Sequence, residues 1–460
     1  MTTPAPARSA SEALDPRTQT LLRAPVVPLL LRMSWPNVIV MVTQAAAGLL
    51  ETWLIGRLGT DALAGMALVF PGVMLMQMLS AGALGGAISS AVARALGGGR
   101  RADANALVLH ALVIDAVLAL AITAAMLVFG REIYAALGGR GAALEAALAY
   151  SNVVFLGNIF LWLMNGLASV IRGSGNMLTP ALVILAGAVL LVPVSAALIF
   201  GVGPIPALGV AGGALAFVLF NLGGMVALGL YVLSGRNVAR FVWTKPRWAL
   251  FADILRVGAV GVVSTIQTNL TIIAATALVA SYAGSAAVAG YGTGARLEYL
   301  MVPLVFGFGA PLVALVGSNL GAGHRERALH IAWVGAAFSF AICEIIGVAA
   351  ALAPEFWLRL FDSDPTMIET GALYLRCVGP FYGFFGLGLA LYFASQGAGR
   401  LIWPLAAGFA RMIVAVFVGW LVLRATGSLA LFFLTLGGAL ALYGLLIALA
   451  VWRGVWFRGR

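Results

Sequence analysis

Long apolar runs separated by short polar loops make up most of the chain from residue 33 onward. A helix needs about 20 mostly apolar residues to cross a bilayer, and each run is long enough. Because backbone groups in lipid must be satisfied within their own segment, we expect helices and not barrel strands. The pattern predicts twelve spans, at residues 33–56, 62–93, 104–129, 146–171, 177–201, 207–233, 251–282, 286–318, 328–353, 367–395, 401–423 and 428–452.

Three loops of the first half recur in the second half at nearly one offset, 224 or 225 residues. Such a repeat indicates two lobes of the same architecture. Because each repeat holds an even number of spans, both enter the membrane in the same sense. The matched loops are 59–65 with 284–290, 96–104 with 320–328, and 172–180 with 396–404.

The repeat divides the chain into segments. We predict an all-α polytopic membrane protein, with six helices in lobe 33–233 and six in lobe 251–460, related by a parallel pseudo-twofold axis. A basic cytoplasmic linker at 234–250 joins the lobes. Residues 1–32 are mostly polar near their start, carry both charge signs and lack the pattern of a secretory signal. We expect them to form a mostly disordered cytoplasmic tail.

Composition agrees with a lipid environment. The chain is 62% hydrophobic and 9% charged, whereas soluble proteins contain about 25% charged residues. The net charge of +11 does not indicate nucleic acid, because most Lys and Arg residues lie in tails and short loops on one side of the predicted membrane. By the positive-inside rule that side is the cytoplasm. We expect a multi-pass protein of a bacterial inner membrane, with both termini cytoplasmic.

Neither a cofactor nor an enzyme is expected. Cys343 and Cys377 both lie in apolar spans, and the three histidines lack metal-ligand spacing, so no disulfide or metal site is predicted. The glycine-rich turn at 172–180 lacks the preceding strand and the Lys-Ser/Thr pair of a phosphate-binding loop. The charged residues of the spans are scattered along the sequence, whereas a catalytic site needs convergent groups.

The first span carries Pro36, Gln44 and Glu51. A carboxylate inside a membrane is costly and marks a functional site by default. The alternative is that Glu51 lies at the outer headgroup level and stays hydrated. Pro36 interrupts the helical hydrogen-bond ladder and is a candidate bend.

The eighth span carries Arg296 and Glu298. At 1.5 Å per residue, Glu298 lies roughly 18 Å from the outer end, near the midplane. Residues two apart on a helix do not face each other, so we expect one of them to face a central cleft. The alternative is a structural salt bridge from Glu298 to another helix. For Glu344 and Arg376, on consecutive spans, we expect a structural ion pair.

Other polar groups of the spans are candidates for lining a cavity. Intramembrane amides more often join helices than bind ligands, but Asn269 is the counterpart of Gln44 at the 225 offset. Aromatic side chains could hold a cationic amphipath through cation–π contacts. The predicted cavity set is Gln44, Asn221, Gln267, Asn269, Arg296 and Tyr382.

The twelve spans, the L-G-x-G and G-x-G-x-x-x-x-P turns, and G-P-I-P-A-L-G-V-A-G-G-A-L-A at 203–216 together resemble the multidrug and toxic compound extrusion (MATE) family. In its prokaryotic DinF-like branch the first helix carries Pro, Gln and Asp at the spacing of Pro36, Gln44 and Glu51. The N-x-x-x-D pair of that branch's fifth helix is replaced here by Leu191 and Ser195. The amino-terminal ion-coupling network is therefore thinner than the family's.

The resemblance implies an alternating-access antiporter. We expect a monomer in the lipid bilayer that exports small organic, cationic amphipathic compounds in exchange for H⁺ or Na⁺, with Glu51 or Glu298 as the coupling group. No nucleic acid partner is expected. The alternative is a flippase for a lipid-linked saccharide or peptidoglycan precursor, which would favour more than twelve spans and several cationic residues along the cavity.

Overall fold

A computed structural model describes residues 14–204, 206–361 and 363–457 of the chain. Within these residues, eleven helices are long and apolar enough to cross a membrane, and a bent pair makes a twelfth span. The predicted all-α architecture of twelve spans is confirmed. Two helices extend well beyond the predicted spans, because α2 begins at residue 26 and α5 ends at residue 136.

The first lobe follows a short helix, α1 (Pro16–Arg23). It consists of α2 (Val26–Gly56), α3 (Thr60–Gln77), a π-helical segment (Met78–Leu84), α4 (Gly85–Gly97), α5 (Arg101–Ala136), α6 (Gly141–Leu156), α7 (Asn158–Gly173), α8 (Leu178–Phe200) and α9 (Val210–Leu233).

The second lobe begins with α10 (Trp248–Gly321), which holds two spans separated by a non-helical Gly284. It continues with α11 (Arg325–Leu352), α12 (Pro354–Leu358), α13 (Pro365–Val378), a 3₁₀ turn (Gly379–Phe381), α14 (Tyr382–Gly397), α15 (Ile402–Met412), a π-helical segment (Ile413–Val418), α16 (Gly419–Thr426), α17 (Leu429–Trp452) and a last 3₁₀ turn (Val455–Phe457).

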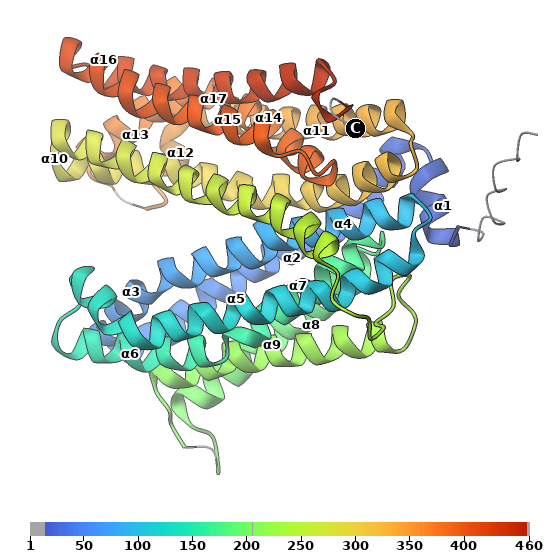
Figure 1. The fold of residues 1–460 in the computed structure, drawn as a ribbon. Coiled ribbons are helices and arrows are strands. Elements are labelled where there is room, and N and C mark those ends of the chain that lie inside the picture. Colours follow the sequence, from blue (N-terminus) through green and yellow to red (C-terminus); the bar gives the residue numbers. More distant parts are fainter. Residues whose placement is uncertain (1–13, 205, 362, 458–460) are drawn as a thin grey trace, which may run out of the picture.

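Each lobe packs around a hydrophobic core, and each core also takes in a few residues of the other lobe, such as Leu30 of α2 in the second core and Ile254 of α10 in the first. Figure 1 shows two groups of helices that lie close together near α1 and the carboxyl end of α17 and diverge toward the opposite end. We call the end near α1 and the carboxyl end of α17 the terminal end of the molecule.

The recurring loops have a shared backbone geometry that explains their glycines. Each matched loop places a glycine at positive φ, a conformation that costs glycine little and is strained for other residues. Such a glycine ends a helix in a tight turn, so the repeat conserves turns as well as spans. The pairs are Gly59 (+117°) with Gly284 (+72°), Gly99 (+71°) with Gly323 (+83°), and Gly175 (+81°) with Gly399 (+70°).

One span of each lobe is broken at equivalent positions. Helices α6 and α7 meet at Gly157 with a bend of 47°. Helices α13 and α14 are separated by the 3₁₀ turn that ends at Phe381, 224 residues after Gly157. Both breaks lie inside spans that the apolar pattern predicts as continuous.

The start of the chain is more ordered than the sequence suggested. Residues 16–23, expected in a disordered tail, form α1, whose Leu21 is buried in the core of the second lobe. The Asn319 amide donates a hydrogen bond to the Leu21 carbonyl at 3.2 Å. The tail prediction is wrong for this helix because its apolar residues find a partner in the distant α10, and residues 1–13 lie outside the described residues.

Candidate substrate cavity and carboxylate pairs

A central cavity of about 330 Å³ lies between the lobes. Its volume is within the range of roughly 300–1,000 Å³ seen for small-molecule sites. The first lobe contributes residues of α2, α3, α7, α8 and α9 and of its π-helical segment, and the second contributes residues of α10, α14, α15 and α17. The polar part of the lining consists of Gln44, Gln77, Asn165, Arg172, Asn221, Ser264, Thr265, Gln267, Thr268, Tyr392, Arg411 and Tyr443.

The lobes are joined tightly at the terminal end. The Ser90 hydroxyl donates to the carbonyl oxygens of Gln396 at 2.5 Å and Gly397 at 3.0 Å. The Arg94 guanidinium binds Gly397 O at 3.2 Å and the Asp253 carboxylate at 2.8 Å. These contacts join α4 to α14 and to the start of α10, so the cavity is closed at this end.

Helix α4 also approaches α10 closely, through backbone that carries no side chain. A Cβ added at Gly97 would lie only 2.0 Å from the Ser318 carbonyl oxygen. No larger residue fits without moving the two helices apart. Gly97 is therefore part of the closed end.

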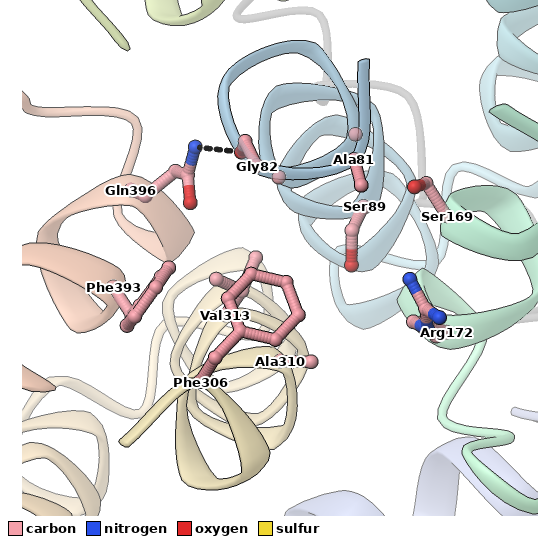
Figure 2. Close-up of a pocket in the computed structure, with 12 residues that line it drawn as sticks. Ala81, Gly82, Ser89, Ser169, Arg172, Phe306, Ala310, Val313, Phe393 and Gln396 are labelled. Carbon is pink, nitrogen blue, oxygen red and sulfur yellow. Dashed lines mark hydrogen bonds between the residues drawn. The ribbon is translucent and has the colours of Figure 1, made fainter. Parts of the chain in front are cut away.

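The floor of the cavity carries a buried arginine. Arg172 of α7 is only 6% exposed, and it also lines a small space of about 20 Å³ between the lobes. Figure 2 shows Arg172 and Ser169 on α7 facing Ser89 of α4, with Phe306 on the other side of the space. None of the ion pairs found among the described residues includes Arg172, and its Nε has no hydrogen-bond partner there.

A buried charge without a counter-ion costs several kcal/mol. Arg172 lies in the last turn of α7, where the helix dipole favours a cation by about 0.3–1 kcal/mol. The dipole offsets only part of the cost, so the guanidinium has a strong tendency to attract an anion or water from the cavity.

A second cavity, of about 120 Å³, lies within the first lobe and is lined by Glu51. Glu51 is 7% exposed, so it is buried within the lobe, and its depth in the membrane stays a prediction. The Tyr150 hydroxyl donates to Glu51 Oε1 at 3.2 Å. The second cavity adjoins the central one, because Gln44, Met74, Gln77 and Phe220 line both.

Glu298 forms a corresponding pair in the second lobe. The Tyr374 hydroxyl donates a hydrogen bond to Glu298 Oε1, and the charge of Arg411 acts on this carboxylate. Tyr374 is also packed edge-on against Tyr291 and Phe433, at ring distances of 5.1 and 5.3 Å. Glu298 does not line the central cavity, whereas Arg411 does, so the two charges lie on opposite sides of the cavity wall.

The predicted cavity residues divide into two sets. The structure places Gln44, Asn221 and Gln267 on the wall of the central cavity, and their role in binding stays a prediction. Gln267 is also tied to α15, because its amide donates to the Gly408 carbonyl at 2.9 Å.

Asn269, Arg296 and Tyr382 do not line the cavity, so their assignment to it is wrong. Asn269 follows Gln267 by two residues and therefore faces away from it. Arg296 is exposed and lies over the ring of Phe361 at 5.5 Å. Tyr382 is fully buried within the second lobe.

Two further expectations can be compared with the structure. Helix α2 continues through Pro36, and the bend there stays a prediction. Glu344 and Arg376 form no ion pair within the described residues. Instead, Glu344 accepts a hydrogen bond at 2.8 Å from the backbone N–H of Gly383. Gly383 lies in the first turn of α14, where N–H groups lack partners within the helix.

Sequence reasoning missed several polar residues of the cavities. Gln77 and Asn165 line the central cavity, Tyr150 contacts Glu51, and Arg172 forms the floor. Arg172 directly precedes a Gly-rich turn, a pattern that indicates a loop residue and not one that lines a cavity.

Two membrane-spanning repeats around a central cavity that is closed at one end are typical of a polytopic membrane transporter. The MatE family model matches residues 36–197 and again residues 261–421, so one model covers both lobes at the offset found in the loops. The chain belongs to the MatE family, the multidrug and toxic compound extrusion transporters. Members of this family are transporters and not enzymes.

Curated relatives carry two kinds of name. The chain is 28% identical over 383 residues to a protein of Shewanella oneidensis named FAD transporter, covering 82% of each chain. It is 30% identical over 346 residues to the probable multidrug resistance protein NorM of Deinococcus radiodurans, covering 72% of each. A NorM of Thermotoga maritima is 27% identical over 381 residues.

Solved structures share the fold. An outward-facing MATE transporter of the MOP superfamily superposes with a TM-score of 0.88 at 21% identity, covering 97% of this chain and 100% of that one. A Pyrococcus furiosus transporter of the same superfamily, described as having a binding pocket of reverse polarity, gives 0.87 at 21% identity and covers 96% and 99%.

Proposed function

We propose that the protein is a secondary active exporter of small organic compounds that works by alternating access. The observation that carries this proposal is the central cavity between the repeats, closed at one end by the contacts of Ser90, Arg94 and Gly97. By the positive-inside rule the terminal end is cytoplasmic. The state described is then open to the outside, and transport requires the α4 contacts to separate.

We further propose that Glu51 couples transport to an inward ion gradient. It lies in a cavity that shares four lining residues with the central one, so its charge can influence how the two lobes close around a substrate. A proton needs only the carboxylate. A sodium ion needs several oxygen ligands, for which Gln44, Gln77 and Tyr150 line the same cavity as Glu51.

The substrate is a small molecule with an aromatic or apolar part. Six aromatic side chains line the central cavity, among them Phe306 and Phe393. A cavity of about 330 Å³ suits such a compound better than a lipid-linked saccharide. The relatives' names suggest flavin nucleotides and drugs as candidates. The bacterial inner membrane, cytoplasmic termini and a monomeric state are part of this proposal.

The test is uptake of a panel of anionic, neutral and cationic fluorescent compounds into everted vesicles, with a pH gradient or a sodium gradient imposed. Wild type and Glu51→Gln are compared with Glu145→Gln as a matched control, because Glu145 is an exposed carboxylate paired with Arg131. We expect gradient-driven uptake in wild type and in the control, and uptake lowered by roughly 100-fold in Glu51→Gln. If no compound moves in response to either gradient in wild type, the exporter proposal is wrong.

If uptake in Glu51→Gln still responds to the gradient as in the control, the assignment of Glu51 is wrong and Glu298 becomes the coupling group. Uptake that responds to the sodium gradient alone would identify sodium, and not the proton, as the coupling ion.

A further inference from the structure

The charges along the central cavity have one sign. Two charged residues line it, Arg172 from the first lobe and Arg411 from the second, and no aspartate or glutamate is among its described lining residues. The expectation of a cationic substrate came from the family resemblance, and a cation would be bound most strongly by carboxylates that face it. Glu51 and Glu298 instead lie behind the wall, each held by a tyrosine.

Arg172 is available for a ligand. It is a buried cation at the cavity floor, its Nε has no hydrogen-bond partner in the described chain, and no acidic residue there pairs with it. An arginine forms two parallel hydrogen bonds to a carboxylate or a phosphate. The Ser89 hydroxyl faces the same space (Figure 2), has no hydrogen-bond partner in the described chain and can add a donor. The Ser169 hydroxyl already donates to the Asn165 carbonyl at 2.7 Å.

Arg411 is held in position by two aromatic rings. Its guanidinium carbon lies 5.8 Å from the ring centres of both Phe385 and Tyr443. All three residues line the cavity, so the arginine is oriented before a ligand arrives. None of the ion pairs found in the described part of the chain includes Arg411, which leaves the guanidinium able to bind an oxyanion.

Aromatic side chains complete the site. Phe306 and Phe393 form an edge-to-face pair with ring centres 5.4 Å apart, and both also line the small space next to Arg172 (Figure 2). A flat ring system placed against them would bring an attached acidic group toward the arginines. Aromatic pairs of this kind add affinity beyond the area they bury.

We propose that the cavity selects organic anions, namely aromatic compounds carrying a phosphate or a carboxylate, through the two positive charges that line it, Arg172 and Arg411. The inference rests on the proposed function, in that it treats the central cavity as the substrate site. It reverses the charge of the substrate expected from the sequence.

The test is equilibrium binding to the purified full-length protein, which needs no gradient and so fails independently of the exporter proposal. Riboflavin 5′-phosphate and riboflavin share one ring system and differ in the phosphate. Fluorescein and rhodamine 6G are related dyes, one an anion with a carboxylate and the other a cation. We expect at least one anion to bind about tenfold or more tightly than its neutral or cationic counterpart, the effect of a charge-assisted hydrogen bond.

The two anions identify the group recognised. Tight binding of riboflavin 5′-phosphate alone supports a phosphate, of fluorescein alone a carboxylate, and of both a general oxyanion site. Equal binding within both pairs, or tighter binding of rhodamine 6G and riboflavin, overturns the proposal whatever the transport assay shows.

Variants then locate the site. We expect Arg172→Met and Arg411→Met to weaken anion binding about tenfold each and to leave riboflavin unchanged, with Arg172→Lys restoring part of the loss. Arg131→Gln is the control, since Arg131 is exposed and paired with Glu145, and it should bind like wild type. If anion preference survives both methionine variants, the arginines are not the selective groups and the assignment is wrong.

Discussion

The two lobes each hold a carboxylate against a tyrosine, but they take the carboxylate from different helices. Tyr374 follows Tyr150 by 224 residues, the offset of the repeat. Tyr150 binds Glu51 of the first span, whereas Tyr374 binds Glu298 of the eighth. The tyrosine is therefore at an equivalent position in the two lobes, whereas the carboxylate comes from a different helix in each.

The surroundings of the two pairs differ more than the pairs themselves. Glu51 faces a cavity, and its described hydrogen-bond partner is one neutral hydroxyl. Glu298 lies in a packed aromatic cluster under the influence of Arg411. A carboxylate that lines a cavity can exchange an ion with water. A carboxylate near a cation acts mainly by neutralising part of that cation's charge. On this comparison we propose that Glu51 of the first lobe couples transport, and that Glu298 of the second lobe acts on the charge of Arg411 in the substrate cavity.

The largest expected effect separates the two carboxylates in transport. Glu51→Gln should lower gradient-driven uptake by roughly 100-fold, because a unit charge in a partly buried site interacts by several kcal/mol. Glu298→Gln should lower uptake by less than tenfold, because Glu298 lies in a packed aromatic cluster and not on a cavity where it could exchange the coupling ion. Initial uptake rates in everted vesicles measure both. Equal losses in the two variants would remove the proposed division between the lobes.

The next effect concerns the charge of the cavity. Glu298→Gln removes the anion that offsets Arg411, so anionic probes should bind up to about tenfold more tightly. Glu51→Gln should change anion affinity by much less, since Glu51 lies in the other lobe. Titration of riboflavin 5′-phosphate measures this difference. Weaker anion binding in Glu298→Gln would mean that the carboxylate positions Arg411 and does not restrain it.

Removing the two equivalent hydroxyls should have unlike consequences. A net hydrogen bond is worth about 0.5–1.5 kcal/mol, so Tyr150→Phe should slow uptake roughly three- to tenfold with little change in thermal stability. Tyr374→Phe leaves Glu298 without its donor inside a packed cluster and should lower thermal stability while slowing uptake less. Melting curves and uptake rates on the same preparations test the contrast, which fails if both variants lose the same property.

The sequence predicted the architecture well, because the length of an apolar run and the residues of a tight turn are local properties. It also indicated Glu51 as a candidate, since a carboxylate in an apolar span is unusual, and its role stays a prediction. The tyrosines that bind Glu51 and Glu298 could not be predicted, because a tyrosine in an apolar helix is common. Only the repeat offset between Tyr150 and Tyr374 relates these two tyrosines to each other. Arg411 is a single charge in an apolar span, and its contacts with Phe385 and Tyr443 depend on which distant helices pack together.

The smallest expected effect concerns the broken spans, where the lobes also differ. In the second lobe the Glu344 carboxylate binds the N–H of Gly383 after the break, and in the first lobe the neutral Thr123 hydroxyl donates to the Phe155 carbonyl at 2.7 Å before it. Hydrogen bonds to charged groups stabilise by about 1.5–3 kcal/mol and neutral ones by about 0.5–1.5. Glu344 is only half-buried, so its share lies at the lower end of that range. Thermal unfolding should therefore show a moderate loss for Glu344→Leu and a smaller one for Thr123→Val, with anion binding unchanged in both. A larger loss for Thr123→Val would contradict this. It would mean that the bend at Gly157 depends more on its side-chain hydrogen bond than the break before α14 does.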